Sequence, residues 1–161
     1  METVCAAVLI AELVRIGWVD ARTRTVLLLD VVALALMRCA FALMAFGGAF
    51  AHGSPAYLLW APAGIVSSCA AALAAATFLW LIGKAVSFRS ENAALGTGDA
   101  WLCAVLPLFL NAGDVPLFLI VSATGACIEA LWCIVRGKRD FPFAPCLVAS
   151  LGAIVVWRLW F

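Results

Sequence analysis

The sequence predicts an all-α membrane protein with about six transmembrane helices and both termini outside the cytoplasm. Three observations support this prediction: the composition, a series of apolar segments, and the alternation of basic residues between the connections. Of 161 residues, 67% are hydrophobic and 12% are charged, whereas a soluble domain is about half apolar and a quarter charged. A globule this small has too little interior to bury so much apolar surface. Lipid must therefore be the solvent for most of the chain.

The apolar segments follow one another along the whole chain. A spanning helix needs roughly 20 mostly apolar residues. The fourth segment is shorter, so we expect it to begin inside the preceding connection or to lie partly buried between its neighbours. Pro107 predicts a kink within it, and Pro116 predicts the start of the next helix. The predicted helices are Thr3–Val19, Val26–Phe46, Ala63–Ile82, Ala100–Leu110, Val115–Val135 and Phe143–Trp160.

Basic residues occur in alternate connections, and such residues mark the cytoplasmic side. The two connections at 47–54 and 111–114 contain no Lys or Arg. Both termini then lie outside the cytoplasm, with Arg158 as the one exception to the pattern. No linker is long enough to divide the chain, so we expect one transmembrane domain over 1–161. The basic connections hold Arg22 and Arg24, then Lys84 and Arg89, then Arg136, Lys138 and Arg139.

Charge and cysteine usage exclude several classes of function. The net charge of +1 leaves no basic patch of the kind that binds nucleic acid. The seven cysteines stand singly in apolar runs without a CxxC pair, and His52 is the only histidine. We therefore expect small apolar roles for the cysteines, no metal and no cofactor, and a solvated His52. Glu2 stands where a signal peptide has basic residues, so we expect no cleaved signal peptide.

Two aspartates lie at predicted cytoplasmic helix ends, Asp20 in GWVDARTR and Asp99 in GTGDAWL. Two carboxylates brought together can share one proton, so that one activates a water while the other donates to a carbonyl oxygen. Gly96 and Gly98 would let another backbone approach Asp99 closely. The sequence therefore predicts a catalytic pair of Asp20 and Asp99, with Gly96 and Gly98 shaping the site.

The G-x-G-D at 96–99, the basic stretch after Asp20, and D-F-P-F-A-P at 140–145 together resemble the prepilin peptidases. These are bacterial GxGD membrane aspartyl proteases, also called type IV leader peptidases, that cut leader peptides from type IV pilins and pseudopilins. The resemblance covers nearly the whole chain in order and helix count. It implies cleavage of such precursors by Asp20 and Asp99 at the cytoplasmic face of the bacterial inner membrane. The oligomeric state is left open.

The chain looks most like the short stand-alone peptidases of Flp/Tad pilus systems. Larger members carry a cytoplasmic insert with paired CxxC motifs and also methylate the new N-terminus. This chain has no such insert, so we expect a peptidase without methyltransferase activity. Val26-Leu27-Leu28 stands where the family often shows Ile-Pro-Asn, and Trp101 where it favours Lys. These departures leave an alternative: a catalytically inactive peptidase-fold scaffold of a pilus or secretion assembly.

Simpler interpretations exist for each of these acids. Asp20 could balance Arg22 and Arg24 at a helix end, and Asp99 could cap a helix after a glycine turn. Asp114 before Val115-Pro116 is likewise predicted to be a helix N-cap. A small transporter is disfavoured, because the sequence shows no inverted repeat. If the pair is active, the helix dipole predicts Asp99 as the starting base and Asp20 as the protonated acid.

Further ionisable residues lie within the predicted helices, where charges are costly and usually paired. Arg15, Asp30 and Glu129 lie at similar depths below the cytoplasmic end. We expect Arg15 to pair with Asp30 or Glu129 inside the bundle, either as a clamp between helices or as a group that tunes the aspartate pair. Glu12 and Arg38 lie deeper, and their partners are left open.

Overall fold

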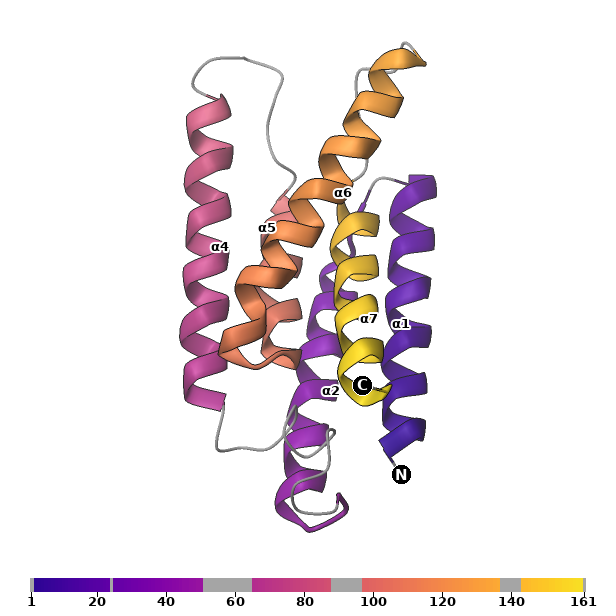
Figure 1. The fold of residues 1–161 in the computed structure, drawn as a ribbon, viewed down its shortest axis with the longest axis vertical. Coiled ribbons are helices and arrows are strands. Elements are labelled where there is room, and N and C mark those ends of the chain that lie inside the picture. Colours follow the sequence, from indigo (N-terminus) through magenta and orange to yellow (C-terminus); the bar gives the residue numbers. More distant parts are fainter. Residues whose placement is uncertain (1, 24, 51–64, 88–96, 137–142, 161) are drawn as a thin grey trace.

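The computed structural model is a bundle of α-helices (Figure 1) and describes residues 2–23, 25–50, 65–87, 97–136 and 143–160. These residues form six α-helices and two short 3-10 helices, with no strand among them. The all-α prediction is therefore confirmed. The α-helices are α1 (Glu2–Thr23), α2 (Leu28–Phe46), α4 (Ile65–Ser87), α5 (Thr97–Val105), α6 (Val115–Val135) and α7 (Ala144–Trp160), and the 3-10 helices are η2 (Leu106–Phe109) and η3 (Ala112–Asp114).

Successive α-helices run in alternate directions along the bundle (Figure 1). Helix α1 begins and α7 ends at the lower end of the view, whereas α1 ends and α5 begins toward the upper end. Helix α1 packs most extensively on α7, while α5 lies against α4, η2 and α2. The helix ends that carry Asp20 and Asp99 therefore lie toward the same end of the bundle.

Helix α1 continues past its predicted end at Val19 as far as Thr23. No residue in this stretch breaks the helix, and the Thr23 hydroxyl donates a hydrogen bond to the Val19 carbonyl at 2.8 Å. Asp20 consequently lies within the helix, where its side chain can be buried, and not beyond the helix end.

Helix α5 begins three residues earlier than predicted, at Thr97, inside the preceding connection. Asp99 is therefore in the first turn of the helix. After Val105 the chain tightens into the 3-10 helix η2, which contains Pro107, so the irregularity expected from this proline is present. Leu102, Leu106 and Phe109 are fully buried. The short fourth segment thus lies enclosed by its neighbours, as its length predicted.

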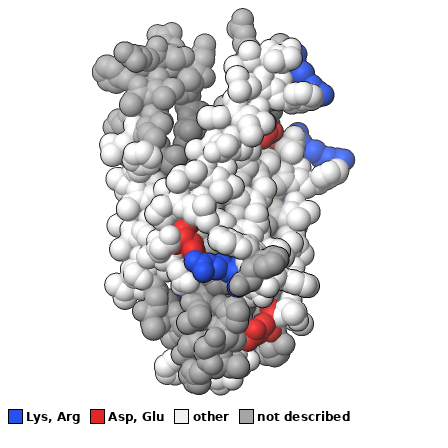
Figure 2. Space-filling model, viewed as in Figure 1, with Lys and Arg blue, Asp and Glu red and all other residues white. Residues whose placement is uncertain are grey.

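Apolar side chains also cover much of the outside of the bundle. Leu36, Leu43, Val66 and Ile134 are each more than 60% exposed, and exposed apolar surface on this scale marks contact with lipid or another protein. On the face shown in Figure 2, the described surface is mostly uncharged, and the charged side chains form a few small groups.

Two helical stretches in the described residues are long and apolar enough to cross a membrane, Leu28–Phe46 and Ala112–Val135. The other apolar helices in this part of the chain are shorter, at Val66–Phe78, Gly98–Phe109 and Ala144–Trp160. Helix α1 has the length but carries several charges, among them Glu12, Arg15 and Asp20. The six-span arrangement therefore stays a prediction.

Candidate active site

Asp20 and Asp99 reach the same region from two different helices. The Asp20 side chain, in the last turns of α1, is 5% exposed. Asp99 is partly buried in the first turn of α5, outside the two stretches long enough to span a membrane. Burial, and after it the negative charge of Asp20, raise the pKa of the Asp99 carboxyl from 3.8 to about 6. The two carboxyls are thus close enough for the charge of one to affect the proton of the other.

Gly98, the residue before Asp99, packs against the connection between α1 and α2. A Cβ on Gly98 would lie 2.8 Å from the Cβ of Val26 and 3.6 Å from its Cα, closer than side chains pack. Only a residue without a Cβ allows this approach. The glycine therefore brings α5 against the α1–α2 connection, which leads out of the helix that carries Asp20.

For Asp99, burial acts against the order of protonation that the helix dipole predicts. A helix start stabilises an anion by only about 0.3–1 kcal/mol. Burial of the carboxyl works in the opposite direction, and its effect on the pKa is larger. Burial and the negative charge of Asp20 both favour the protonated form of Asp99. In this arrangement Asp20 is the better candidate for the base.

Two observations bear on the simpler interpretations, in which Asp20 balances nearby arginines and Asp99 caps a helix. The Arg22 guanidinium lies over the Trp18 ring, 4.4 Å from its centroid. Residues two positions apart do not face each other on a helix, so Arg22 is directed away from the side of α1 on which Asp20 is buried. Arg24, the other arginine in that interpretation, lies outside the described residues. Asp99 lies within the first turn of α5, so it is not the residue that precedes the helix.

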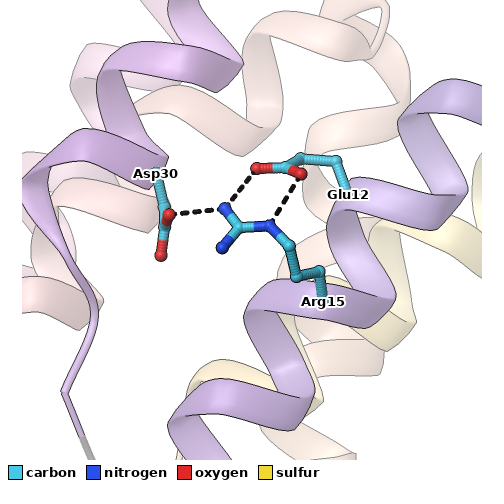
Figure 3. A network of polar contacts seen from close by, with 3 residues as sticks. All are labelled: Glu12, Arg15 and Asp30. Atoms are coloured by element: carbon cyan, nitrogen blue, oxygen red, sulfur yellow. Dashed lines mark hydrogen bonds and ion pairs between the residues drawn. The ribbon is translucent and has the colours of Figure 1, made fainter.

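Arg15 joins Glu12 and Asp30 in one network of polar contacts (Figure 3). Its Nη2 donates to Asp30 Oδ1 at 2.5 Å and to Glu12 Oε1 at 2.6 Å, and its Nε donates to Glu12 Oε2 at 2.9 Å. The predicted contact with Asp30 is present. Because the Arg15 side chain is 47% exposed, the network lies at the side of the bundle and not inside it. Glu12, whose partner the sequence left open, follows the common spacing of three residues along a helix.

Glu129 is not part of this network, so of the two partners predicted for Arg15 the described structure has Asp30 and not Glu129. It accepts a hydrogen bond from the Cys146 thiol at 3.0 Å. Close by, a Cβ on Gly125 would lie 3.7 Å from Cys146. Helix α6 packs on α7, which in turn packs on α1. Helix α7 therefore takes the place beside α1 that the pairing with Glu129 required.

A second ion pair lies at the opposite end of the bundle. Asp114, just before α6, accepts hydrogen bonds from the Arg158 guanidinium, with Nε and Oδ2 3.2 Å apart. Its side chain makes no capping hydrogen bond, so it occupies the N-cap position but does not act as a cap. The predicted topology placed both residues on the same face of the membrane, and this was the available signal for the pair.

Arg38, whose partner the sequence left open, donates a hydrogen bond from its Nε to the Leu108 carbonyl at 2.5 Å.

Part of the predicted site lies outside the described residues, namely Gly96, the 88–96 part of its loop, His52, and the Asp140–Pro142 part of D-F-P-F-A-P. Within the described ranges, no group of three or more His, Cys, Asp or Glu side chains is arranged to hold a metal ion. Comparison of the chain with known protein families, curated proteins and solved structures gave no match. The prepilin peptidases therefore remain a resemblance carried by particular residues.

Proposed function

We propose that this chain is a multi-pass membrane aspartyl endopeptidase, with Asp20 and Asp99 as its catalytic pair. The observation that carries the proposal is that two acids from different helices, Asp20 buried and Asp99 partly buried, lie toward the same end of the bundle, where the charge of Asp20 helps to raise the pKa of Asp99. Aspartyl proteolysis requires two carboxyl groups that share one proton. The substrates that the sequence resemblance suggests are type IV pilin-like or pseudopilin precursors.

The reaction follows from the order of protonation. Asp20, as carboxylate, takes a proton from a water whose oxygen attacks the scissile carbonyl carbon. Asp99 gives its proton to the carbonyl oxygen, so that a neutral tetrahedral diol forms. Asp20 then passes its new proton to the amide nitrogen as the C–N bond breaks, and Asp99 recovers a proton from one hydroxyl of the diol. Water is consumed and both carboxyls return to their starting states.

The position of the pair suits a substrate at a membrane boundary. Asp99 begins a helix and Asp20 lies near the end of another, while apolar side chains cover much of the described surface elsewhere. Such a surface supports a bundle that lies in lipid. In this arrangement the acids meet the precursor where its polar leader joins an apolar helix, at the cytoplasmic face of a bacterial inner membrane.

The direct test is co-expression with a small precursor that has a glycine before a hydrophobic run. Wild-type protein should shorten the precursor, and Asp20→Asn and Asp99→Asn should each leave it uncut, because asparagine keeps the shape and loses the proton chemistry. Asp114→Asn is the matched control, since it removes a buried acid at the other end of the bundle and should leave cleavage intact. All variants should be compared for expression and for unfolding temperature in detergent.

Cleavage that persists in Asp20→Asn or Asp99→Asn would contradict the proposal. Failure of the wild type to cut any such precursor would instead favour the non-catalytic scaffold of a pilus or secretion assembly.

A further inference from the structure

The two acids of the proposed pair are held by helices whose main contacts lie elsewhere. Helix α1 packs chiefly on α7, whereas α5 packs chiefly on α4 and also on η2, α2 and α7. The relative position of Asp20 and Asp99 therefore depends on the elements that connect these helices. Two helices contact both of them, α7 and α2, and α2 also follows α1 directly in the chain.

Arg15 ties α1 to the first turn of α2. Glu12 binds the guanidinium through both Nε and Nη2, which fixes its direction, and Nη2 reaches Asp30 Oδ1 at 2.5 Å. Asp30 is 2% exposed, and its Oδ2 is buried without a hydrogen-bond partner in the described structure. Arg15 thus supplies the ion pair that holds this carboxylate, and Figure 3 shows the guanidinium between the two acids.

This tie continues to Asp99 through a second contact. Val26, four residues before Asp30, meets Gly98 so closely that a Cβ there would lie 2.8 Å from the Val26 Cβ. Gly98 precedes Asp99 in the chain, and Arg15 precedes Asp20 by five residues on the same helix. The contacts therefore run from Asp20 along α1 to Arg15, across to Asp30, back to Val26, and on to Gly98 and Asp99.

We propose that the Arg15–Asp30 ion pair is a positioning clamp, which holds the α1–α2 connection against α5 and so sets the approach of Asp20 to Asp99. The inference rests on the proposed function only for its effect on cleavage, because its effect on the geometry of the two acids can be measured separately. Arg15 and Asp30 touch neither water nor substrate in the proposed reaction, so both are positioning residues.

The structure offers a matched control in the pair Arg158–Asp114. It too joins a half-exposed arginine to a buried aspartate, with side-chain exposures of 49% and 5% against 47% and 2% for Arg15 and Asp30. It lies at the end of the bundle away from the candidate active site. Loss of either pair should loosen the fold to a similar degree, but only loss of the first should separate the catalytic acids.

The test is an NMR titration of the ¹³C-labelled aspartate carboxyls in detergent, for wild type, Arg15→Gln, Arg15→Lys and Arg158→Gln. Asp20 is the titratable group whose charge raises the pKa of Asp99 in the described structure. In Arg15→Gln the pKa of Asp99 should move from about 6 toward 3.8, since Asp20 withdraws. Loss of the positive charge alone would move it upward, so the sign distinguishes displacement from a simple charge effect.

Cleavage provides the second measurement. Arg15→Gln should lower kcat/KM by about a hundredfold, the loss that a displacement of about 1 Å causes at a catalytic site. Arg15→Lys keeps the charge and should recover part of both the rate and the pKa. Arg158→Gln should leave both unchanged.

An unchanged or raised pKa of Asp99 in Arg15→Gln would overturn the clamp, and so would an equal fall in Arg158→Gln. If Arg15→Gln does not fold, the same comparison is made with Arg15→Lys, whose weaker contact should give a smaller downward movement. If wild type cuts no precursor, the proposed function fails, yet the titration still decides whether the ion pair sets the approach of the two acids.

Discussion

Gly98 and Val26 are in such close contact that the smallest side chain on the glycine would overlap the valine, with the two Cβ atoms 2.8 Å apart. This contact joins the residue before one candidate catalytic acid to the connection that follows the helix of the other. It also lies at a position where the resemblance to prepilin peptidases departs from the usual Ile-Pro-Asn pattern. Val26 thus differs from the residue usual in that pattern, yet it packs closely against Gly98.

Gly98→Ala should displace the first turn of α5 from the α1–α2 connection. Overpacking of this kind typically lowers the free energy of unfolding by about 1–3 kcal/mol, and the displaced Asp99 should cut precursor about 10–100-fold more slowly. Val26→Gly in the same chain removes the clashing Cβ and should restore part of the rate. Gly152→Ala is the control, since a Cβ there meets nothing within 4 Å. Equal effects of Gly98→Ala and Gly152→Ala would contradict the role of the contact.

Asp99→Asn should stabilise the protein at neutral pH. The folded protein holds the Asp99 proton up to about pH 6, against an ordinary pKa of 3.8. The stability that this proton contributes is therefore present below about pH 4 and is lost as pH rises through about 6. Asparagine has no proton to lose, so the variant should gain about 1–2 kcal/mol over wild type at pH 7.5, after allowance for solvent screening, and nothing at pH 4. Thermal unfolding in detergent at both pH values measures this, and parallel pH dependences would contradict it.

The rate of cleavage should fall as pH rises through about 6, because Asp99 then loses the proton that it donates. A second, acidic limb should appear where Asp20 becomes protonated, and both limbs belong to the coupled pair. The measurement is kcat/KM against pH with a fluorogenic precursor peptide in micelles. A rate that stays constant between pH 5 and 8 would count against a shared proton.

A double-mutant cycle on Arg15 and Asp30 should show strong coupling. Arg15→Gln leaves the Asp30 carboxylate, 2% exposed, without its counter-ion, and breaking a buried pair in this way costs about 3–5 kcal/mol. The half-exposed position of Arg15 should place this loss at the lower end. Arg15→Gln with Asp30→Asn removes both charges and should be more stable than Arg15→Gln alone. Unfolding in mixed micelles gives the four free energies, and purely additive losses would argue against the pair.

Gly17→Val should force α1 away from α7. Even a Cβ at Gly17 would lie 2.9 Å from Val148 Cγ2, and valine adds two further methyl groups. We expect a lower unfolding temperature and slower cleavage, with partial recovery in Gly17→Val with Val148→Ala, which supplies room. Gly125→Ala is the control, since its nearest neighbours lie at an ordinary 3.7 Å. A fully stable Gly17→Val would show that the two helices can separate without loss.

Much of the helix pattern could be predicted from apolar run lengths. Helix α6 has the predicted bounds, Val115–Val135, because Pro116 favours a helix start. The ends near Asp20 and Asp99 could not be located in this way, since polar residues that prolong a helix, as at Thr23, do not register in hydropathy. Both acids consequently lie inside helices.

For the ionisable residues, the sequence predicted the depth of each along its helix but not which side chains it contacts. Arg15 and Asp30 shared a predicted depth and do meet. Glu129 shared it as well, yet lies beside Cys146, because the order of helices around the bundle does not follow from sequence length. The Asp114–Arg158 contact depends on that same order. The contact of Gly98 with Val26 requires a three-dimensional approach that no local spacing reveals.

The extensive packing of α1 on α7 has a consequence for biosynthesis. The helix that bears Asp20 leaves the ribosome first among those described, while its principal partner leaves last. Until α7 has been synthesised, α1 lacks the surface that packs against Gly17. Helix α1 therefore reaches its final packing only after the last of the described helices has been made.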